Sequence, residues 1–166
     1  MTDAIEKLLT ETIGLDSASV GPTVVRQAVK DRMAACGITN PQAYREHLSG
    51  SSQELQELIN AVVIPETWFF RDREAFTMLA RHARMHKRAQ PIKVLSLPCS
   101  TGEEAYSIAI ILHELLKDNP KNIAVKIFAT DIDTIALAHA GTGMYKSDIV
   151  KDISPERLRK YFSKEN

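Results

Sequence analysis

Two adjacent glutamates stand in a loop that connects an apolar run to a helix-like stretch. Residues 96–107 read SLPCSTGEEAYS, in which Gly102 is followed by Glu103 and Glu104. A loop from a strand into a helix exposes backbone N–H groups, and phosphate-binding loops of this kind need several glycines. The two carboxylates would repel a pyrophosphate but suit a ligand with cationic groups, such as the sulfonium and ammonium groups of S-adenosylmethionine. Glu103 alone is equally consistent with a favourable charge in the first helical turn.

A further acidic position follows the next apolar run. Residues 128–133 read FATDID, and Asp131 lies 29 positions beyond Gly102. In nucleotide-binding α/β folds, an acidic residue at the end of this strand accepts hydrogen bonds from the ribose hydroxyls. Asp131 is therefore a candidate ribose ligand, with helix N-capping as its alternative role. We interpret Asp133 as the N-cap of the helix that follows.

The segment PETWFFRDREAF, residues 65–76, lies where the character of the sequence begins to change. Three aromatic residues in a row, Trp68, Phe69 and Phe70, are typical of core packing at such a junction. Arg71 is different, because its guanidinium group can hold a carboxylate through two hydrogen bonds. Spacing alone does not establish this role.

These residues must be positioned by elements that the periodicity predicts. The first 90 residues carry helical periodicity only, and the predicted helices span residues 4–13, 22–36, 41–48, 52–62 and 71–87. After Pro91, predicted strands at 92–97 and 123–129 alternate with helices at 103–117 and 132–140, and a short helix follows Ser154. This order indicates parallel strands joined by a right-handed crossover.

The fold class predicted from these elements is α/β, with a helical domain in front. We expect a helical N-terminal domain at 1–64, a linking segment and helix at 65–90, and the first half of a doubly wound α/β domain at 91–166. Doubly wound sheets usually hold about five or six strands. Two predicted strands therefore indicate that the sheet is incomplete within this chain.

Composition excludes several classes of protein. The chain has 166 residues, of which 44% are hydrophobic and 25% charged, and this is ordinary for a globular protein. Its longest apolar runs fall short of the roughly 18 residues that span a membrane. The N-terminus is acidic and amphipathic, unlike a secretory signal. We therefore expect a cytoplasmic protein with no membrane insertion.

Charge is unevenly distributed although the net charge is zero. Residues 1–64 carry five basic and eight acidic side chains, whereas residues 65–93 carry seven basic and three acidic ones. Such a basic block can dock an acidic partner or nucleic acid, or it can be a solvated helix face. No recognisable nucleic-acid-binding motif accompanies it, and we expect no nucleic-acid partner.

The two cysteines, Cys36 and Cys99, predict no metal site. They are far apart in the sequence and belong to no CxxC motif with a nearby histidine pair. Cys99 follows a predicted strand, where hydrolases place a nucleophile, but neither His113 nor His139 has a placement that identifies a partner. A nicotinamide-dependent oxidoreductase is another alternative for this topology, against which the acidic loop argues.

Taken together, PETWFFRD, LSLPCSTGEEAYSIA and FATDIDTIALAHAGTGMY resemble the CheR-type chemotaxis-receptor glutamate O-methyltransferases. The resemblance covers the whole chain, weakly over 1–60 and specifically over 65–146. It implies a Rossmann-like, class I S-adenosylmethionine-dependent methyltransferase domain after the helical domain. S-adenosylmethionine is the implied methyl donor and S-adenosylhomocysteine the implied product.

The resemblance assigns roles to particular residues. Thr67 and Arg71 fall on the entry motif, implying contact with the methionine portion of the donor, and Arg71 is the implied catalytic residue. Glu104 falls on the cofactor-binding glutamate of the loop that contains Gly102, and Asp131 falls on the ribose-binding aspartate. Two departures are Pro65, where many members have asparagine, and Pro98, which lacks a backbone donor.

The resemblance also implies substrates and partners. The acceptors are glutamate side chains on the cytoplasmic helices of methyl-accepting chemoreceptors, which the basic block or basic residues of the helical domain would dock. Family members continue for roughly another hundred residues, so we expect this chain to be catalytically incomplete. The alternative is a non-catalytic receptor-binding module that carries a broken methyltransferase half.

Overall fold

The structure is a computed structural model that describes residues 3–85, 91–117 and 123–165. Contacts between residues divide the chain into two units. The helical unit comprises residues 1–64 with 132–134, and the α/β unit comprises residues 65–131 with 135–166. No helix in the described part of the chain is long and apolar enough to cross a membrane.

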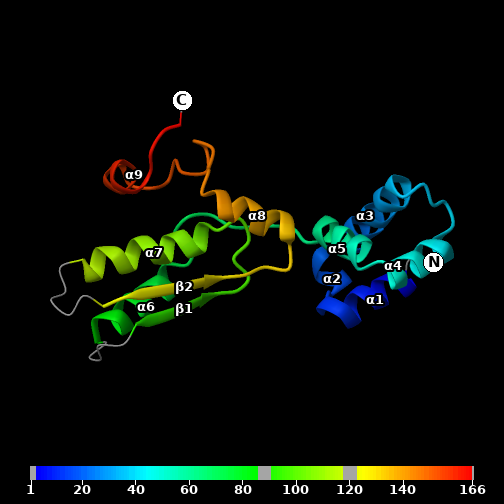
Figure 1. Cartoon of the computed structure of the whole chain (residues 1–166), viewed down its shortest axis with the longest axis horizontal. Coiled ribbons are helices and arrows are strands. Elements are labelled where there is room, and N and C mark those ends of the chain that lie inside the picture. The colour runs from blue at the N-terminus through cyan, green and yellow to red at the C-terminus, as the bar shows by residue number, and fades with distance from the viewer. Residues whose placement is uncertain (1–2, 86–90, 118–122, 166) are drawn as a thin grey trace. The chain divides into compact units, whose positions relative to one another are not determined.

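The helical unit confirms the helices predicted from periodicity and adds one short helix. Its helices are α1 Asp3–Ile13, α2 Ser17–Val20, α3 Pro22–Ala35, α4 Pro41–Gly50 and α5 Ser52–Val62 (Figure 1). Helix α2 was not predicted, because four residues, SASV, are too short to display a period. Helix α4 begins after Asn40, which caps it, since its side chain accepts hydrogen bonds from Gln42 N and Ala43 N.

Apolar stripes of four of these helices form the core of the helical unit. Helix α5 begins after Ser51, whose side chain accepts a hydrogen bond from Glu54 N. The side chains that are buried completely in this core come from α1, α3, α4 and α5: Leu9, Val25, Tyr44, Leu58 and Val62. The periodicity of the first 64 residues therefore describes the packing of this unit.

The α/β unit alternates helices and parallel strands. Its elements are α6 Arg73–Met85, β1 Ile92–Ser96, α7 Glu103–Leu116, β2 Val125–Ala129, α8 Thr134–Thr142 and α9 Pro155–Tyr161. Strands β1 and β2 pair in parallel, with Ile92 opposite Val125 and Ser96 opposite Ala129. The predicted parallel pairing is thus confirmed. The predicted helix at 71–87 begins two residues later, because the side chain of Asp72 caps it by accepting from Glu74 N and Ala75 N; residues 86 and 87 lie outside the described part.

One face of the two-stranded sheet is packed and the other is open. Ile92 is buried with α7 residues Ile108 and Leu112 in a single core cluster, and Ala83 of α6 belongs to the same cluster. On the opposite face, Leu95 and Phe128 are opposite each other in register and are 61% and 55% exposed. Because side chains alternate along a strand, this pattern leaves the carboxyl ends of β1 and β2 accessible from one side.

Candidate functional site

Glu104 is held in place by the last residue of β1. Ser96 is 1% exposed, and its hydroxyl group donates a 2.7 Å hydrogen bond to Oε1 of Glu104. Glu104 lies in the first turn of α7 and is exposed. A buried serine at the strand end thus fixes one carboxylate oxygen while the residue faces solvent at the mouth of the loop.

Asp131 lies at the end of the neighbouring strand and is tied to the same loop. The backbone N–H of Ser100 donates a 2.6 Å hydrogen bond to Oδ2 of Asp131. Beyond the sheet, Thr130 N donates to Ser96 O and Cys99 N donates to Thr130 O, at 3.1 and 3.0 Å. These bonds continue the pairing of β1 and β2 past the sheet, so the loop and Asp131 are held together.

Ser100 carries two unusual features for a loop residue. Its φ angle is +48°, in the left-handed region that residues other than glycine rarely adopt. Its hydroxyl oxygen is buried and has no hydrogen-bond partner within the described residues. Strained backbone and unsatisfied buried polar atoms gather at ligand sites, where a bound molecule supplies the missing partner.

Cys99 is close enough to Asp131 and Glu104 to feel their charges. It is 1% exposed, and burial raises the pKa of its thiol, with the charges of Asp131 and Glu104 raising it further. A protonated thiol is a poor nucleophile, because the thiolate is the reactive form. This environment argues against Cys99 as the nucleophile of a hydrolase.

Gly102 has a structural reason to be glycine. Its φ is +98°, and a Cβ atom there would lie 2.8 Å from Oη of Tyr145 and 2.9 Å from Cβ of Ala140 in α8. Tyr145 also donates from its hydroxyl group to Thr101 O at 2.7 Å. Packing of the turn after α8 against the loop therefore accounts for Gly102, whose assignment to the cofactor stays a prediction.

The entry segment, residues 65–72, is attached to α7 through a buried serine. Phe70 N donates a 2.9 Å hydrogen bond to Oγ of Ser107, and Ser107 donates to Glu103 O at 2.6 Å. Phe70 has a φ of +59°, again in the left-handed region. The backbone that carries Arg71 is thus positioned by the helix that carries Glu104.

Arg71 is held within its own segment. Its guanidinium group donates to Glu66 O and to Oε2 of Glu66, the latter at 3.3 Å, and lies 4.4 Å from the centre of the Trp68 ring. Thr67 beside it is half-buried. Core packing is confirmed for Phe69, which is 6% exposed, but it is wrong for Trp68, a residue that is 47% exposed and whose ring has the guanidinium group of Arg71 over one face.

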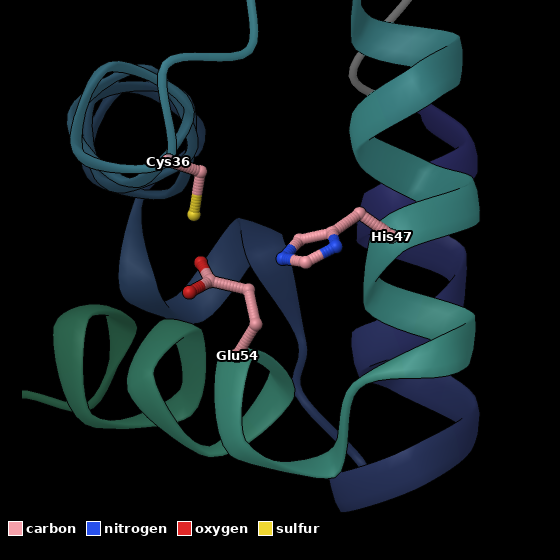
Figure 2. Close-up of side chains that lie close together, drawn as sticks. All are labelled: Cys36, His47 and Glu54. Carbon is pink, nitrogen blue, oxygen red and sulfur yellow. The ribbon is translucent and has the colours of Figure 1, made fainter.

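Among the described residues, side chains of the helical unit bring metal-ligating atoms close together. Ligand atoms of Cys36, His47 and Glu54 lie within 4.8 Å of one another (Figure 2). Both carboxylate oxygens of Glu54 are already engaged, since Arg32 donates to Oε1 and Oε2 at 3.0 and 2.6 Å and Tyr44 donates to Oε1 at 2.7 Å. A guanidinium group on the carboxylate disfavours a second cation, so this cluster does not fit a metal ion.

The structure thus gathers some of the predicted residues and leaves others apart. Glu104 is bonded to the end of β1 and Asp131 to the loop that follows β1, whereas Thr67 and Arg71 lie on the entry segment, which is bonded to α7 through Ser107. Sequence reasoning did not single out three serines that position these groups: Ser96, Ser100 and Ser107. All three lie inside the segment 96–107, and this position could have drawn attention to them. Ser96 ends the strand, Ser100 lies in the turn, and Ser107 lies near the start of the helix.

Comparison with known proteins decides which family this arrangement represents. Residues 65–166 match the family described as CheR methyltransferase, SAM binding domain, and residues 2–63 match CheR methyltransferase, all-alpha domain. The chain belongs to the CheR methyltransferase family. Its fold is accordingly an all-helical domain followed by a Rossmann-like S-adenosylmethionine-binding domain, as the resemblance implied.

Curated relatives within the CheR family carry two kinds of name. The probable biofilm formation methyltransferase WspC of Pseudomonas aeruginosa is 42% identical over 149 residues, which cover 87% of this chain and 35% of the relative. The chemotaxis protein methyltransferase of Escherichia coli is 35% identical over 160 residues, covering 95% of this chain and 54% of the relative. That of Salmonella typhimurium is 37% identical over 158 residues, with 94% and 54% covered. The chain therefore spans between about a third and about half of the length of these relatives.

The residues around the loop fit the ligand of a CheR SAM-binding domain. Glu104 and Asp131 offer carboxylate oxygens, which accept hydrogen bonds from ammonium and hydroxyl groups. The buried hydroxyl group of Ser100 lacks a partner among the described residues. This set of acceptors matches a nucleoside that carries a ribose diol and an amino-acid ammonium group.

Proposed function

We propose that this chain is the donor-binding part of a protein-glutamate O-methyltransferase that uses S-adenosylmethionine. The observation that carries the proposal is the pair of fixed carboxylates at the ends of β1 and β2. Ser96 holds Glu104, and Ser100 holds Asp131, in one loop of a CheR SAM-binding domain. When bound, the donor supplies an electrophilic methyl group on a sulfonium ion.

Each of the predicted donor-site residues has a proposed part in binding this donor. Asp131 accepts hydrogen bonds from the ribose hydroxyls, since one carboxylate can accept from both. Glu104 faces the cationic portion, where its negative charge is favourable. Thr67 and Gly102 belong to the same proposed donor site, Thr67 on the methionine side and Gly102 through the backbone of the loop.

Arg71 is the proposed catalytic residue. Its guanidinium group is about half exposed and bonded to Glu66, an exposed partner that a substrate carboxylate can replace. A glutamate acceptor has a pKa of about 4.3 and is ionised at neutral pH, so the chain needs no general base. The proposed contribution of Arg71 is to orient the acceptor carboxylate and to exclude water around this carboxylate.

The proposed acceptors are glutamates on the cytoplasmic helices of methyl-accepting chemoreceptors. Two relatives are named chemotaxis protein methyltransferases, which supports a chemosensory substrate. The name WspC of a third relative refers to biofilm formation, so outputs other than chemotaxis belong to the same proposal. The alternative is a receptor-binding module that does not bind the donor.

Calorimetry with S-adenosylhomocysteine tests the proposal on the chain itself. We expect saturable binding that weakens at least about tenfold in Glu104→Gln and in Asp131→Asn, as the loss of one charge-assisted hydrogen bond predicts. Asp148→Asn, an exposed acidic residue in the turn after α8, is the matched control and should bind as the parent chain does. Absence of binding by this chain, with binding by a chain extended to the length of the relatives, would favour the module.

A further inference from the structure

A groove in the α/β unit lies outside the proposed donor site. It has a volume of about 1090 Å³ and runs between α6, α7 and residues 152–157. We define its floor as a set of apolar side chains of its lining that come from the entry segment, α6, α7 and residues 152–157: Phe70, Phe76, Ile111, Leu115 and Ile153. Ile111 and Ile153 are buried, whereas Phe70, Phe76 and Leu115 are partly exposed. The floor therefore presents some apolar surface to solvent.

Basic residues line one side of this groove. Arg73, Arg81 and Arg84 project from α6 into its lining, and all three residues are exposed. Within the described part of the chain none of the three takes part in a salt bridge. Their spacing along α6 places Arg73 and Arg84 roughly 16 Å apart along the helix axis, about three helical turns.

The groove has few other charged side chains, and two of them, Arg157 and Glu114, neutralise each other. Arg157 donates two hydrogen bonds to Glu114, at 3.0 and 2.8 Å, and its guanidinium carbon lies 4.4 Å from the centre of the Phe70 ring. Apart from Glu114, Asp152 is the acidic residue among the described residues of the lining. The groove is therefore apolar at its base and positively charged along α6.

We propose that this groove binds an acidic amphipathic helix of a partner protein. Such a helix places an apolar stripe in a hydrophobic groove through residues at positions i, i+3 or i+4, and i+7. Acidic residues beside the stripe would meet Arg73, Arg81 and Arg84, whose span corresponds to about three turns of the bound helix. The proposal goes beyond the proposed methyl transfer, because it concerns a surface formed by α6, α7 and residues 152–157 and requires no donor.

The floor favours a protein helix over a nucleic acid. Single-stranded nucleic acids stack their bases on exposed aromatic faces within a strongly basic channel. Here the guanidinium group of Arg157 lies over the Phe70 ring, and Phe70 and Phe76 lie edge-on with ring centres 6.2 Å apart. Aliphatic side chains supply the rest of the floor, and these suit leucine or methionine side chains of an incoming helix.

A synthetic peptide provides the test. The probe is a fluorescein-labelled 15-residue peptide with leucines at helical spacing, flanked by glutamates, and fluorescence anisotropy measures its binding to the full 166-residue chain. One comparison peptide replaces each glutamate by glutamine, and a second has the same composition in scrambled order. We expect saturable binding of the probe and at least about tenfold weaker binding of both comparison peptides. The first lacks the acidic side chains, and the second lacks the apolar stripe.

Paired variants locate the binding surface. Arg81→Glu with Arg84→Glu should weaken binding at least about tenfold, because reversal converts two attractions into repulsions. The matched control is Lys93→Glu with Lys126→Glu. It reverses the charges of two exposed lysines that are paired in register on the open face of the sheet. This control should retain the affinity of the parent chain, and circular dichroism should show that both variants are folded.

Chemical-shift mapping of the labelled chain supplies a readout that does not depend on variants. Addition of the probe should shift amide resonances of α6, α7 and residues 152–157 together. The proposal is overturned if the probe does not bind, if the arginine variant binds it unchanged, or if the shifts fall on other elements. Tighter binding of a single-stranded RNA oligonucleotide than of the peptide would assign the groove to nucleic acid instead.

Discussion

The backbone N–H of Ser100 lies 2.6 Å from Oδ2 of Asp131, joining the loop after β1 to the end of β2. A hydrogen bond to an ionised acceptor is worth about 1.5–3 kcal/mol. Because the donor is a backbone group, the bond fixes the course of the loop as well as the side chain of Asp131. The carboxylate proposed to bind ribose is therefore also a structural part of the loop that carries Glu104.

Replacement of Asp131 should loosen the loop as well as weaken donor binding. In Asp131→Ala the Ser100 amide loses its acceptor, and its hydrogen exchange should accelerate by about tenfold or more. Asp131→Asn keeps an acceptor oxygen and should give an intermediate rate. Exchange at Ile108 in α7 should stay unchanged, as a control for global unfolding. An unaltered Ser100 rate in Asp131→Ala would contradict the role assigned to this bond.

Gly102 should tolerate no side chain, even where no donor is present. Gly102→Ala places a Cβ atom within 3 Å of Tyr145 and Ala140 at a φ of +98°. Left-handed strain and overpacking should together lower the free energy of unfolding by roughly 2–4 kcal/mol. Urea unfolding followed by Trp68 fluorescence measures this loss.

A neighbouring glycine supplies the control for Gly102. Gly143 has a φ of +63° and the nearest atom to a Cβ there, Oη of Tyr106, lies 3.1 Å away at the end of a side chain that can shift. Gly143→Ala should therefore cost less than Gly102→Ala. Equal losses would mean that backbone strain alone, without the contact with α8, explains the glycine in the loop.

Local patterns in the sequence were sufficient to predict much of this architecture. Both strands, the parallel pairing and the short helix after Ser154 follow from periodicity and from cap chemistry. These features depend on residues within a few positions of one another. The carboxylates Glu104 and Asp131 could be singled out as candidates from equally local patterns, since Glu104 lies in the first turn of the helix after β1 and Asp131 lies two residues beyond the end of β2.

Contacts between distant residues account for what was missed. Ser107 receives Phe70 N across 37 positions, and Tyr145 reaches Thr101 across 44. No period or motif encodes such pairs in one sequence. Trp68 was missed for a different reason. A large aromatic residue was expected to be buried in the core, but this one lies at the surface with the guanidinium group of Arg71 over its ring.

Ser107 should prove necessary for the position of the entry segment. In Ser107→Ala the Phe70 amide and Glu103 O lose their shared partner, which should lower the free energy of unfolding of the α/β unit by about 1–3 kcal/mol. Hydrogen exchange at Phe70 should accelerate more than exchange at Ile108. Ser107→Thr, which keeps the hydroxyl group, should restore slow exchange wherever its added methyl group is accommodated.

Zinc should not stabilise the helical unit. Arg32 and Tyr44 occupy both oxygens of Glu54, so Cys36 and His47 lack a third ligand. Addition of Zn²⁺ should leave Tm unchanged, and Co²⁺ should produce no thiolate charge-transfer band. A band that appears in the parent chain and disappears in Cys36→Ala would show that the cluster binds metal after all.

Acid should destabilise the helical unit through Glu54. Hydrogen bonds from Arg32, and further ones from Tyr44, outweigh burial and lower the pKa of the Glu54 carboxyl from 4.5 to about 2. A carboxyl whose pKa is lower in the folded state stabilises the fold fully above its unfolded pKa. That contribution is lost as the pH falls from about 5 towards 2, and it amounts to at most about 3 kcal/mol.

Glu54→Gln separates this contribution from those of other acidic residues. The variant should be less stable at pH 7, because an amide cannot pair with the charge of Arg32, and its stability should fall less steeply in acid. Glu57→Gln is the matched control, since Glu57 lies 3.8 Å from the same guanidinium group but its side chain is 43% exposed. Urea unfolding monitored through methyl resonances of Val25 and Leu58, both fully buried in this unit, reports on the helical unit alone. Identical pH profiles for the parent chain and Glu54→Gln would show that the pair of Arg32 and Glu54 contributes nothing to acid sensitivity.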